Sequence, residues 1–344
     1  MKTNGTYIDF DTALENFFQK YLVSELGASQ NTIRSYRDAF VLLIDFFEGV
    51  KKVHPDRLSF EHITKDNVIE YLNWLETTKG SGTSTRNNRC AAIKSMARYM
   101  IYTDPTHMAQ WQSLLSIKTK KETKETVKYL TVEAMTKLLE EIDLSTSQGR
   151  RDHAMLSVMY YTGARAEEMC GLTPSSIRMS SPYLVEVLGK GSKKRCVPID
   201  DDLLHLLQAY MHEHGLDRPE MNRHPLFYNV WGGKLTTAGV TYVVNKHVKP
   251  VKAKYPELFT VNVSPHTFRH SRAMHLLQSG VNLIIIRDIL GHVSVQTTET
   301  YARVDSKLKR DAIAKAYNVV GKHEPEQSSW EKDPKLKAFL KGLA

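Results

Sequence analysis

Apolar side chains recur every three or four positions along the first third of the chain, which is the spacing of a helix with one buried face. The repeat is clear over three ranges: residues 10–26, 33–47 and 68–75. Ser29 or Asn31 is expected to cap the second of these helices. After a turn-rich break, KGSGTS, the segment TRNNRCAAIKSMARYMIY predicts a fourth helix, with Ser84 or Thr85 as its N-cap. Residues 10–116 therefore predict an all-helical domain.

From Leu130 onward, helical and extended patterns alternate. TVEAMTKLLEEI, with Thr131 as its cap, and RRDHAMLSVMYYTG, which ends at Gly163, both have helical periodicity. SSIRM, YLVEVLG and KKRCVPID indicate short strands, and GKGS between the last two is typical of a hairpin turn. Helical patterns return in five segments: DDLLHLLQAYMHEH, TTAGVTYVVNKHV, HTFRHSRAMHLLQS, NLIIIRDIL and DSKLKRDAIAKAY. We therefore predict a mostly α protein whose second domain is α+β with a small antiparallel sheet.

The two predicted domains are joined by a charged segment, IKTKKETKETVK, which lacks apolar periodicity. A chain of 344 residues is long enough for two cores. We predict four parts in order: a helical domain over residues 1–116, a linker over 117–128, an α+β domain over 129–320 and a tail over 321–344. The tail carries apolar residues at near-helical spacing: Trp330, Leu336, Phe339, Leu340 and Leu343.

Positive charge is concentrated in one part of this basic chain, whose net charge is +9. Residues 80–130 contain 9 Lys and Arg against 3 Asp and Glu, whereas residues 1–79 contain 9 against 12. This balance favours a polyanionic partner, nucleic acid first of all. The fourth helix carries the candidates for contacts with phosphates and base edges: Arg86, Arg89, Lys94 and Arg98. An ordinary solvated helix face is the alternative interpretation.

The three cysteines, Cys90, Cys170 and Cys196, form no C-x-x-C pair. Each is expected to be a buried, reduced thiol, which indicates a reducing compartment. The N-terminal segment has no apolar signal-peptide core, and no stretch reaches membrane-spanning length. We therefore expect a soluble, cytoplasmic protein with no membrane partner.

The second half of the chain contains the groups that phosphodiester cleavage without a cofactor requires. A nucleophile must attack phosphorus, fixed cations must bind the growing negative charge, and an acid must protonate the leaving oxygen. Arginine suits the second task because its planar fork donates two bonds and keeps its proton. The candidates are Arg165 in TGARAEE, Lys190 in GKGSKKR, His266 and Arg269 in PHTFRH, His292 in LGH and Tyr301 in TTETYARV.

Two other chemistries fit these segments less well. GKGS is not a phosphate-binding P-loop, because the G-x-x-x-x-G-K-[ST] pattern is absent. His266 and His270 are four residues apart and could form a metal pair. However, H-E-x-x-H is absent and no third ligand stands at a suggestive spacing. We therefore expect no metal and no other cofactor.

Four segments, taken in order, resemble the signature blocks of the tyrosine recombinase (phage integrase) family. They are TGARAEEMCGL, GKGSKKRCVPI, SPHTFRHSRAMHLLQSG and LGHVSVQTTETYARV, and the last two are closest to simple Xer-like members. The resemblance covers residues 10–315, because the helical first domain is similar to the SAM-like core-binding domain of that family. It implies a fold of a helical DNA-binding domain followed by a catalytic domain.

The resemblance also implies a role for each candidate residue. Tyr301 would be the nucleophile that forms a 3′-phosphotyrosyl bond and releases a 5′-hydroxyl. Arg165 and Arg269 would clamp the scissile phosphate, and Lys190 would protonate the leaving oxygen. His266 would help to deprotonate the tyrosine.

Two further positions in the blocks have implied roles. His292 stands where the family has His or Trp, which bonds the phosphate. Glu168 resembles the acidic residue that supports the active site, and a carboxylate beside an arginine fixes its geometry. The family usually has a small residue immediately before that acid, whereas this chain has Glu167. Which of the two glutamates supports the site is therefore left open.

Site-specific recombination of double-stranded DNA is the function that the resemblance implies. Monomers in solution would assemble as a tetramer on two sites and exchange strands through a Holliday junction, with accessory DNA-bending or directionality factors as further partners. Integration, excision and dimer resolution all use this chemistry. The tail would pack on a neighbouring subunit or on its own, or stay unfolded. The alternatives are a type IB topoisomerase or telomere resolvase, and a DNA-binding protein that has lost catalysis.

Overall fold

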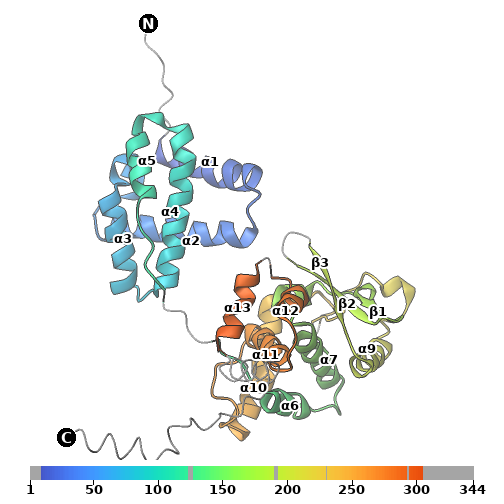
Figure 1. Ribbon diagram of the computed structural model, residues 1–344. Coiled ribbons are helices and arrows are strands. Elements are labelled where there is room, and N and C mark those ends of the chain that lie inside the picture. The colour runs from blue at the N-terminus through green and yellow to red at the C-terminus, as the bar shows by residue number, and fades with distance from the viewer. Residues whose placement is uncertain (1–8, 123–126, 190–192, 230, 293, 305–344) are drawn as a thin grey trace, which may run out of the picture. The chain divides into compact units, whose positions relative to one another are not determined.

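The computed structural model describes residues 9–122, 127–189, 193–229, 231–292 and 294–304 (Figure 1). The chain divides into two compact units, Met1–Lys124 and Glu125–Ala344, and each is described by itself. The last helix expected from the sequence, over residues 305–317, and the tail over residues 321–344 lie outside the described residues. Within the described part of the chain, no helix is long and apolar enough to cross a membrane.

The first unit is all helical, as predicted. Its helices are α1 (Phe10–Asn16), which continues as a π-helix (Phe17–Glu25), α2 (Gln30–Gly49), α3 (Lys65–Thr77), α4 (Thr83–Thr103) and α5 (Met108–Leu115). Short 3₁₀ turns lie at Pro55–Arg57, Phe60–His62 and Pro105–His107. Ser29 caps α2 as expected, because its hydroxyl accepts the N–H of Thr32 at 3.2 Å.

The expected cap of α4 is wrong. The helix begins at Thr83, and Gly82 occupies the N-cap position with an extended backbone. The Gly82 carbonyl already accepts the N–H of Arg86 at 3.0 Å, so Ser84 and Thr85 lie inside the first turn. Elsewhere in the unit, aromatic side chains fill the core, with Phe17, Phe46 and Trp111 almost fully buried.

The second unit is mostly helical with a small sheet, which confirms the predicted fold class. Its helices are α6 (Val132–Glu140), α7 (Ser147–Thr162), α8 (Ala166–Cys170), α9 (Asp201–Glu213), α10 (Thr237–Lys254), α11 (Pro265–Gln278), α12 (Leu283–Leu290) and α13 (Val295–Val304). Short 3₁₀ turns lie at Pro174–Ser176 and Pro219–Met221. Thr131 caps α6 as expected.

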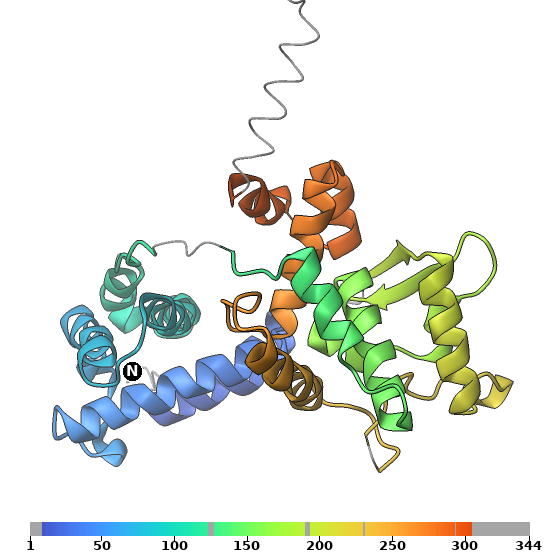
Figure 2. The ribbon, with the colours of Figure 1, turned by 90° about the horizontal axis from the view of Figure 1, so that it is seen from below.

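Three antiparallel strands form the sheet in the order β1 (Ile177–Arg178), β2 (Leu184–Leu188) and β3 (Lys194–Pro198). Val185 pairs with Val197 on its buried face. Figure 2 shows the sheet at one side of the second unit, beside α9. Cys196 lies on the exposed face of β3, so its expected burial is wrong, whereas Cys90 and Cys170 are buried.

Gly163 ends α7 in the left-handed conformation, with φ of 58°. A Cβ at this position would lie 2.6 Å from Cδ2 of Leu290. Gly280 also has a positive φ, 84°, but a Cβ there would meet nothing within 4 Å. Both glycines therefore have a left-handed backbone, but only Gly163 is closely packed.

We expect Gly280→Ala to lower the free energy of unfolding by about 1 kcal/mol, through backbone strain alone. Gly163→Ala should lower it by a further ~1–3 kcal/mol, because the methyl group also overpacks against Leu290. Denaturant unfolding of both purified variants measures the difference. Equal losses would show that α12 moves aside without cost.

Candidate active site

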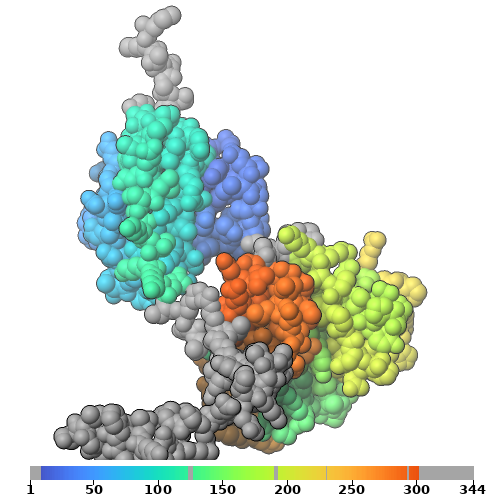
Figure 3. Space-filling model, in the orientation of Figure 1, coloured from blue at the N-terminus to red at the C-terminus, as the bar shows by residue number. Residues whose placement is uncertain are grey.

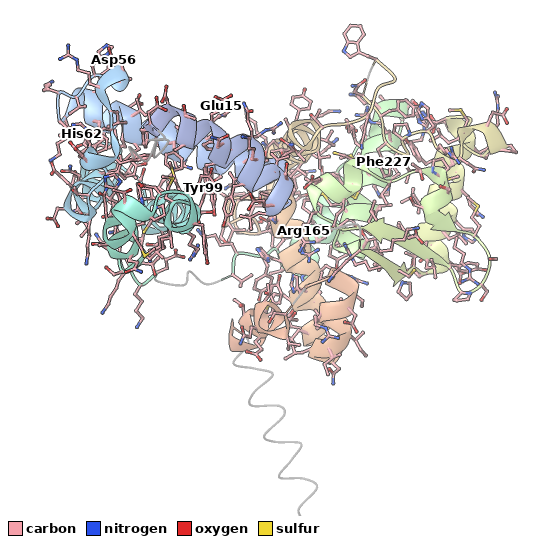
Figure 4. All side chains as sticks on the ribbon, turned by 90° about the horizontal axis from the view of Figure 1, so that it is seen from above. Glu15, Asp56, His62, Tyr99, Arg165 and Phe227 are labelled. Atoms are coloured by element: carbon pink, nitrogen blue, oxygen red, sulfur yellow. The ribbon has the colours of Figure 1, made fainter. Side chains whose placement is uncertain are left out.

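Arg165 stands at the N-cap of α8, two residues beyond the glycine that ends α7. Glu168 accepts the backbone N–H of Arg165 on Oε2 at 2.8 Å, and the Arg165 Nη1 donates to its Oε1 at 2.7 Å. Glu168 is buried and Glu167 is exposed, so Glu168 is the glutamate that orients Arg165. Figure 4 shows Arg165 between the strands and the orange C-terminal helices.

A second arginine, Arg195, holds the other side of Glu168; it lies in the block GKGSKKRCVPI, but no role was predicted for it from the sequence. Its Nη1 and Nη2 donate to the two carboxylate oxygens at 3.0 and 2.7 Å, and its Nε donates to the carbonyl of Ile289 at 2.8 Å. The side chain is 9% exposed. Arg195 therefore joins β3, α8 and the end of α12 through one guanidinium.

The charge of Glu168 is maintained despite its burial. Burial raises the pKa of this carboxyl, but the hydrogen bonds from Arg195 and Arg165 outweigh that effect. The pKa of Glu168 therefore lies below its usual value, and the group is ionised at neutral pH. An ionised carboxylate between two guanidiniums fixes the direction of both forks.

Arg269 lies on α11 and is 3% exposed. Its Nη1 donates to the carbonyl of Gly163 at 2.7 Å, and its Nη2 donates to the carbonyl of Leu290. Both carbonyls stand at helix C-termini, where the helix dipole favours a cation. Burial, reinforced by the charge of Arg165, lowers the pKa of Arg269 to about 10, so it keeps its proton at neutral pH.

His292 follows the left-handed Gly291 that ends α12. Its Nδ1 lies 2.9 Å from the Thr298 hydroxyl, and its ring stacks on the Tyr301 ring at 6.3 Å between centroids and 13° between planes. Burial, with the charge of Arg269 in second place, lowers the pKa of His292 to about 4. This imidazole is therefore neutral at physiological pH.

Tyr301 lies on α13 and is 3% exposed. Figure 3 shows the C-terminal helices of the second unit, coloured orange, at the surface of that unit. Burial raises the pKa of the hydroxyl, while the positive charges of Arg269 and Arg165 oppose that rise. The phenolic oxygen therefore lies within the field of both arginines of its own chain.

The hydroxyl of Tyr301 lies 2.9 Å from Nδ1 of His270. His266, the histidine expected beside the nucleophile, is exposed one turn earlier on α11, with its ring 6.5 Å from that of His270. Lys190 lies outside the described residues. The structure thus gathers five of the seven candidates of the second unit into one site: Arg165, Glu168, Arg269, His292 and Tyr301.

The four basic candidates of α4 do not share one exposed face. Arg86 is 4% exposed, with its Nε 3.5 Å from Glu76. Its side chain therefore does not lie on a solvated face of α4. Arg89 is half-buried and donates to the carbonyl of Ser35 at 2.7 Å. Lys94 is half-buried and Arg98 is exposed. Helix α4 packs against both α2 and α3, which buries positions that sequence periodicity left outside.

No group of three or more His, Cys, Asp or Glu side chains among the described residues is arranged to hold a metal ion. The pair that the sequence suggested, His266 and His270, has its second member against a tyrosine hydroxyl instead. The groups that the described part of the site brings together are guanidiniums, imidazoles, the Glu168 carboxylate and the Tyr301 phenol.

Comparisons with known proteins cover both units. The model of the phage integrase family matches residues 128–307, and that of the phage integrase N-terminal SAM-like domain matches residues 16–102. The y4rC protein of Sinorhizobium fredii, named for the integrases and recombinases, is 37% identical over 96% of this chain and 97% of its own length. Tyrosine recombinase XerD of Oceanobacillus iheyensis is 30% identical over 87% of this chain and 96% of its own length.

Solved structures share the fold at low identity. The XerH site-specific recombinase bound to palindromic difH substrate has a TM-score of 0.67 at 23% identity, over 88% of this chain and 83% of its own. The Tn1549 transposon integrase in complex with transposon right end DNA has a TM-score of 0.69 at 16% identity, over 89% and 99%. These likenesses extend over both units.

Proposed function

We propose, on the premise that this chain belongs to the phage integrase family and is a site-specific recombinase of the tyrosine class, that Tyr301 is the nucleophile that cuts DNA. The observation that carries the proposal is the position of Tyr301, which is 3% exposed, stacks on His292 and has the rise in its hydroxyl pKa opposed by the charges of Arg269 and Arg165. A phosphate held by these two guanidiniums would stand next to the phenolic oxygen of the same subunit.

The cleavage step is a transfer of the phosphoryl group from one oxygen to another. The Tyr301 Oη attacks phosphorus, the bond to the 5′ oxygen breaks, and a 3′-phosphotyrosyl ester stores the bond energy. Arg165 and Arg269 bind the non-bridging oxygens, on which negative charge grows. Arg269 uses two of its five N–H groups on carbonyls, which leaves capacity for phosphate. We assign the proton for the 5′ oxygen to Lys190.

Duplex DNA is the partner that we propose for both units. XerH and the Tn1549 integrase, which have this fold, were solved with DNA. We propose that residues 1–116 and 129–320 bind the duplex from two sides, that four subunits act on two sites, and that the reaction proceeds in the cytoplasm. Accessory factors and a tail over 321–344 that docks on a neighbour are parts of the same proposal. Of the candidates on α4, Arg98 is exposed, Arg89 and Lys94 are half-buried and Arg86 is buried.

Covalent capture tests this function on DNA of unspecified sequence. The protein is incubated with sheared DNA from its source organism, protein-linked fragments are recovered in denaturant, and their ends are sequenced. A nicked duplex built on the recovered site should then accumulate a covalent adduct, because the fragment beyond the nick diffuses away. We expect the adduct to form equally in EDTA. Failure to link any fragment, or a strict need for a divalent ion, would contradict the proposal.

A further inference from the structure

His270 is the side chain in contact with the Tyr301 hydroxyl, although the family resemblance assigns the deprotonation of that tyrosine to His266. The His270 Nδ1 lies 2.9 Å from the Tyr301 Oη, and the two rings are 5.7 Å apart between centroids. Both residues come from helices that pack against each other, α11 and α13. The contact is therefore part of the packed site and needs no rearrangement to form.

The packing around Tyr301 holds this contact in place. Its ring belongs to an apolar cluster with Met274, Leu277, Ile286 and Leu290. His292 stacks on the same ring. A hydroxyl that is withdrawn from water needs a hydrogen-bond acceptor, and the contact that the structure gives it is His270.

His270 has the protonation state of a base. Burial lowers the pKa of its imidazole, and the charges of His266 and Arg269 lower it further. A neutral ring with its proton on Nε2 offers Nδ1 as an acceptor. The Tyr301 hydroxyl, whose pKa burial raises, is protonated at neutral pH and must lose that proton during attack.

We propose that His270 is the catalytic base that takes the proton from Tyr301, a role that rests on the proposed function of the site. As the bond between Oη and phosphorus forms, the proton passes to Nδ1, and the electron pair of the broken bond stays on the 5′ oxygen, which the general acid protonates. Resealing reverses each transfer. The 5′-hydroxyl attacks phosphorus, and the imidazolium of His270 returns its proton to the departing Oη.

Replacement by asparagine separates proton transfer from positioning. The amide oxygen of His270→Asn can accept a hydrogen bond, but it cannot take a proton. We expect His270→Asn and His270→Ala to slow adduct formation on the nicked duplex by roughly 10²–10⁴-fold, with unchanged affinity for DNA. His275 offers a matched control, because it lies on the same helix with its Nδ1 2.8 Å from the Tyr160 hydroxyl. His275→Asn should keep the adduct rate within a few-fold.

A substrate with sulfur in place of the bridging 5′ oxygen shows whether His270 acts on the proton of Tyr301 or on the proton given to the leaving group. A thiolate leaves without protonation, so this substrate should restore cleavage by Lys190→Ala and leave the defect of His270→Asn unchanged. The inference is overturned if His270→Asn matches the wild type, if His270→Ala cleaves faster, if sulfur rescues His270→Asn, or if His266→Asn alone shows the whole loss. A wild-type protein that forms no adduct overturns the proposed function instead.

Discussion

Tyr301→Phe is expected to reduce covalent attachment to DNA by at least about 10³-fold, because the substitution removes the attacking oxygen and nothing else. The remaining ring keeps its place in the apolar cluster and its stacking on His292. Binding to the same duplex should persist, since the guanidiniums that would hold the phosphate are untouched. Gel electrophoresis in denaturant measures the adduct, and mobility shift without denaturant measures binding.

Tyr160→Phe is the matched control for this experiment. The Tyr160 hydroxyl also donates to a histidine of α11, His275, whose Nδ1 lies 2.8 Å away and whose Nε2 donates to the Leu130 carbonyl. Both variants lose one partly buried hydrogen bond, which costs about 0.5–1.5 kcal/mol of stability. Only Tyr301→Phe should lose the adduct. An adduct that persists in Tyr301→Phe would show that another residue, or another subunit, supplies the nucleophile.

Elements whose signals are local could be predicted from the sequence. Ser29 and Thr131 cap their helices where the pattern placed them, and Gly163 ends α7 in the left-handed conformation. The three strands were also visible, because alternation and turn residues act within a few positions. Tyr301, Arg165 and Arg269 could be assigned to one site for a different reason. They lie in four blocks whose order along the chain resembles that of a known family, and members of a family share a fold.

Features that depend on contacts between distant segments could not be predicted in the same way. His266 and His270 share a helical face, and only the position of α13 decides which of them meets Tyr301. Arg86 is buried because Glu76 of α3 stands opposite it. Arg195 left a weak signal, because it shares a face of β3 with the buried Val197. A basic residue on an inward-facing position predicts a buried partner.

Arg195→Met is expected to lower the free energy of unfolding by roughly 3–5 kcal/mol at neutral pH, because it leaves a buried carboxylate without its bidentate partner. The Glu168 side chain is 4% exposed and would retain only Arg165, whose side chain is 37% exposed. Methionine also cannot replace the bond to the Ile289 carbonyl. Denaturant unfolding followed by helical circular dichroism measures the loss.

The pH dependence of this loss has a definite sign. In the wild type the pKa of Glu168 is depressed, so its stabilisation is complete above the unfolded value of 4.5 and disappears as pH falls through the folded value. In Arg195→Met one of the hydrogen-bonding partners that lower the pKa of Glu168 is missing, whereas the burial that raises this pKa remains. The carboxylate therefore protonates at higher pH, and protonation removes the cost of a buried, unpaired charge. The difference between wild type and variant should therefore shrink as pH falls from 7 to below 4.5. A difference independent of pH would show that lost packing, rather than charge, causes it.

The double variant Glu168→Gln/Arg195→Met tests whether Glu168 and Arg195 position Arg165 in addition to stabilising the fold. Removing both charges should recover part of the stability lost by Arg195→Met, since the uncompensated carboxylate is gone. Cleavage should not recover in parallel. Arg165 would then lack the ionised partner that accepts its backbone N–H and its Nη1, and its fork would no longer be fixed toward the phosphate. If stability is restored but adduct formation stays slow, Arg195 and Glu168 position Arg165 for the phosphate in addition to stabilising the fold.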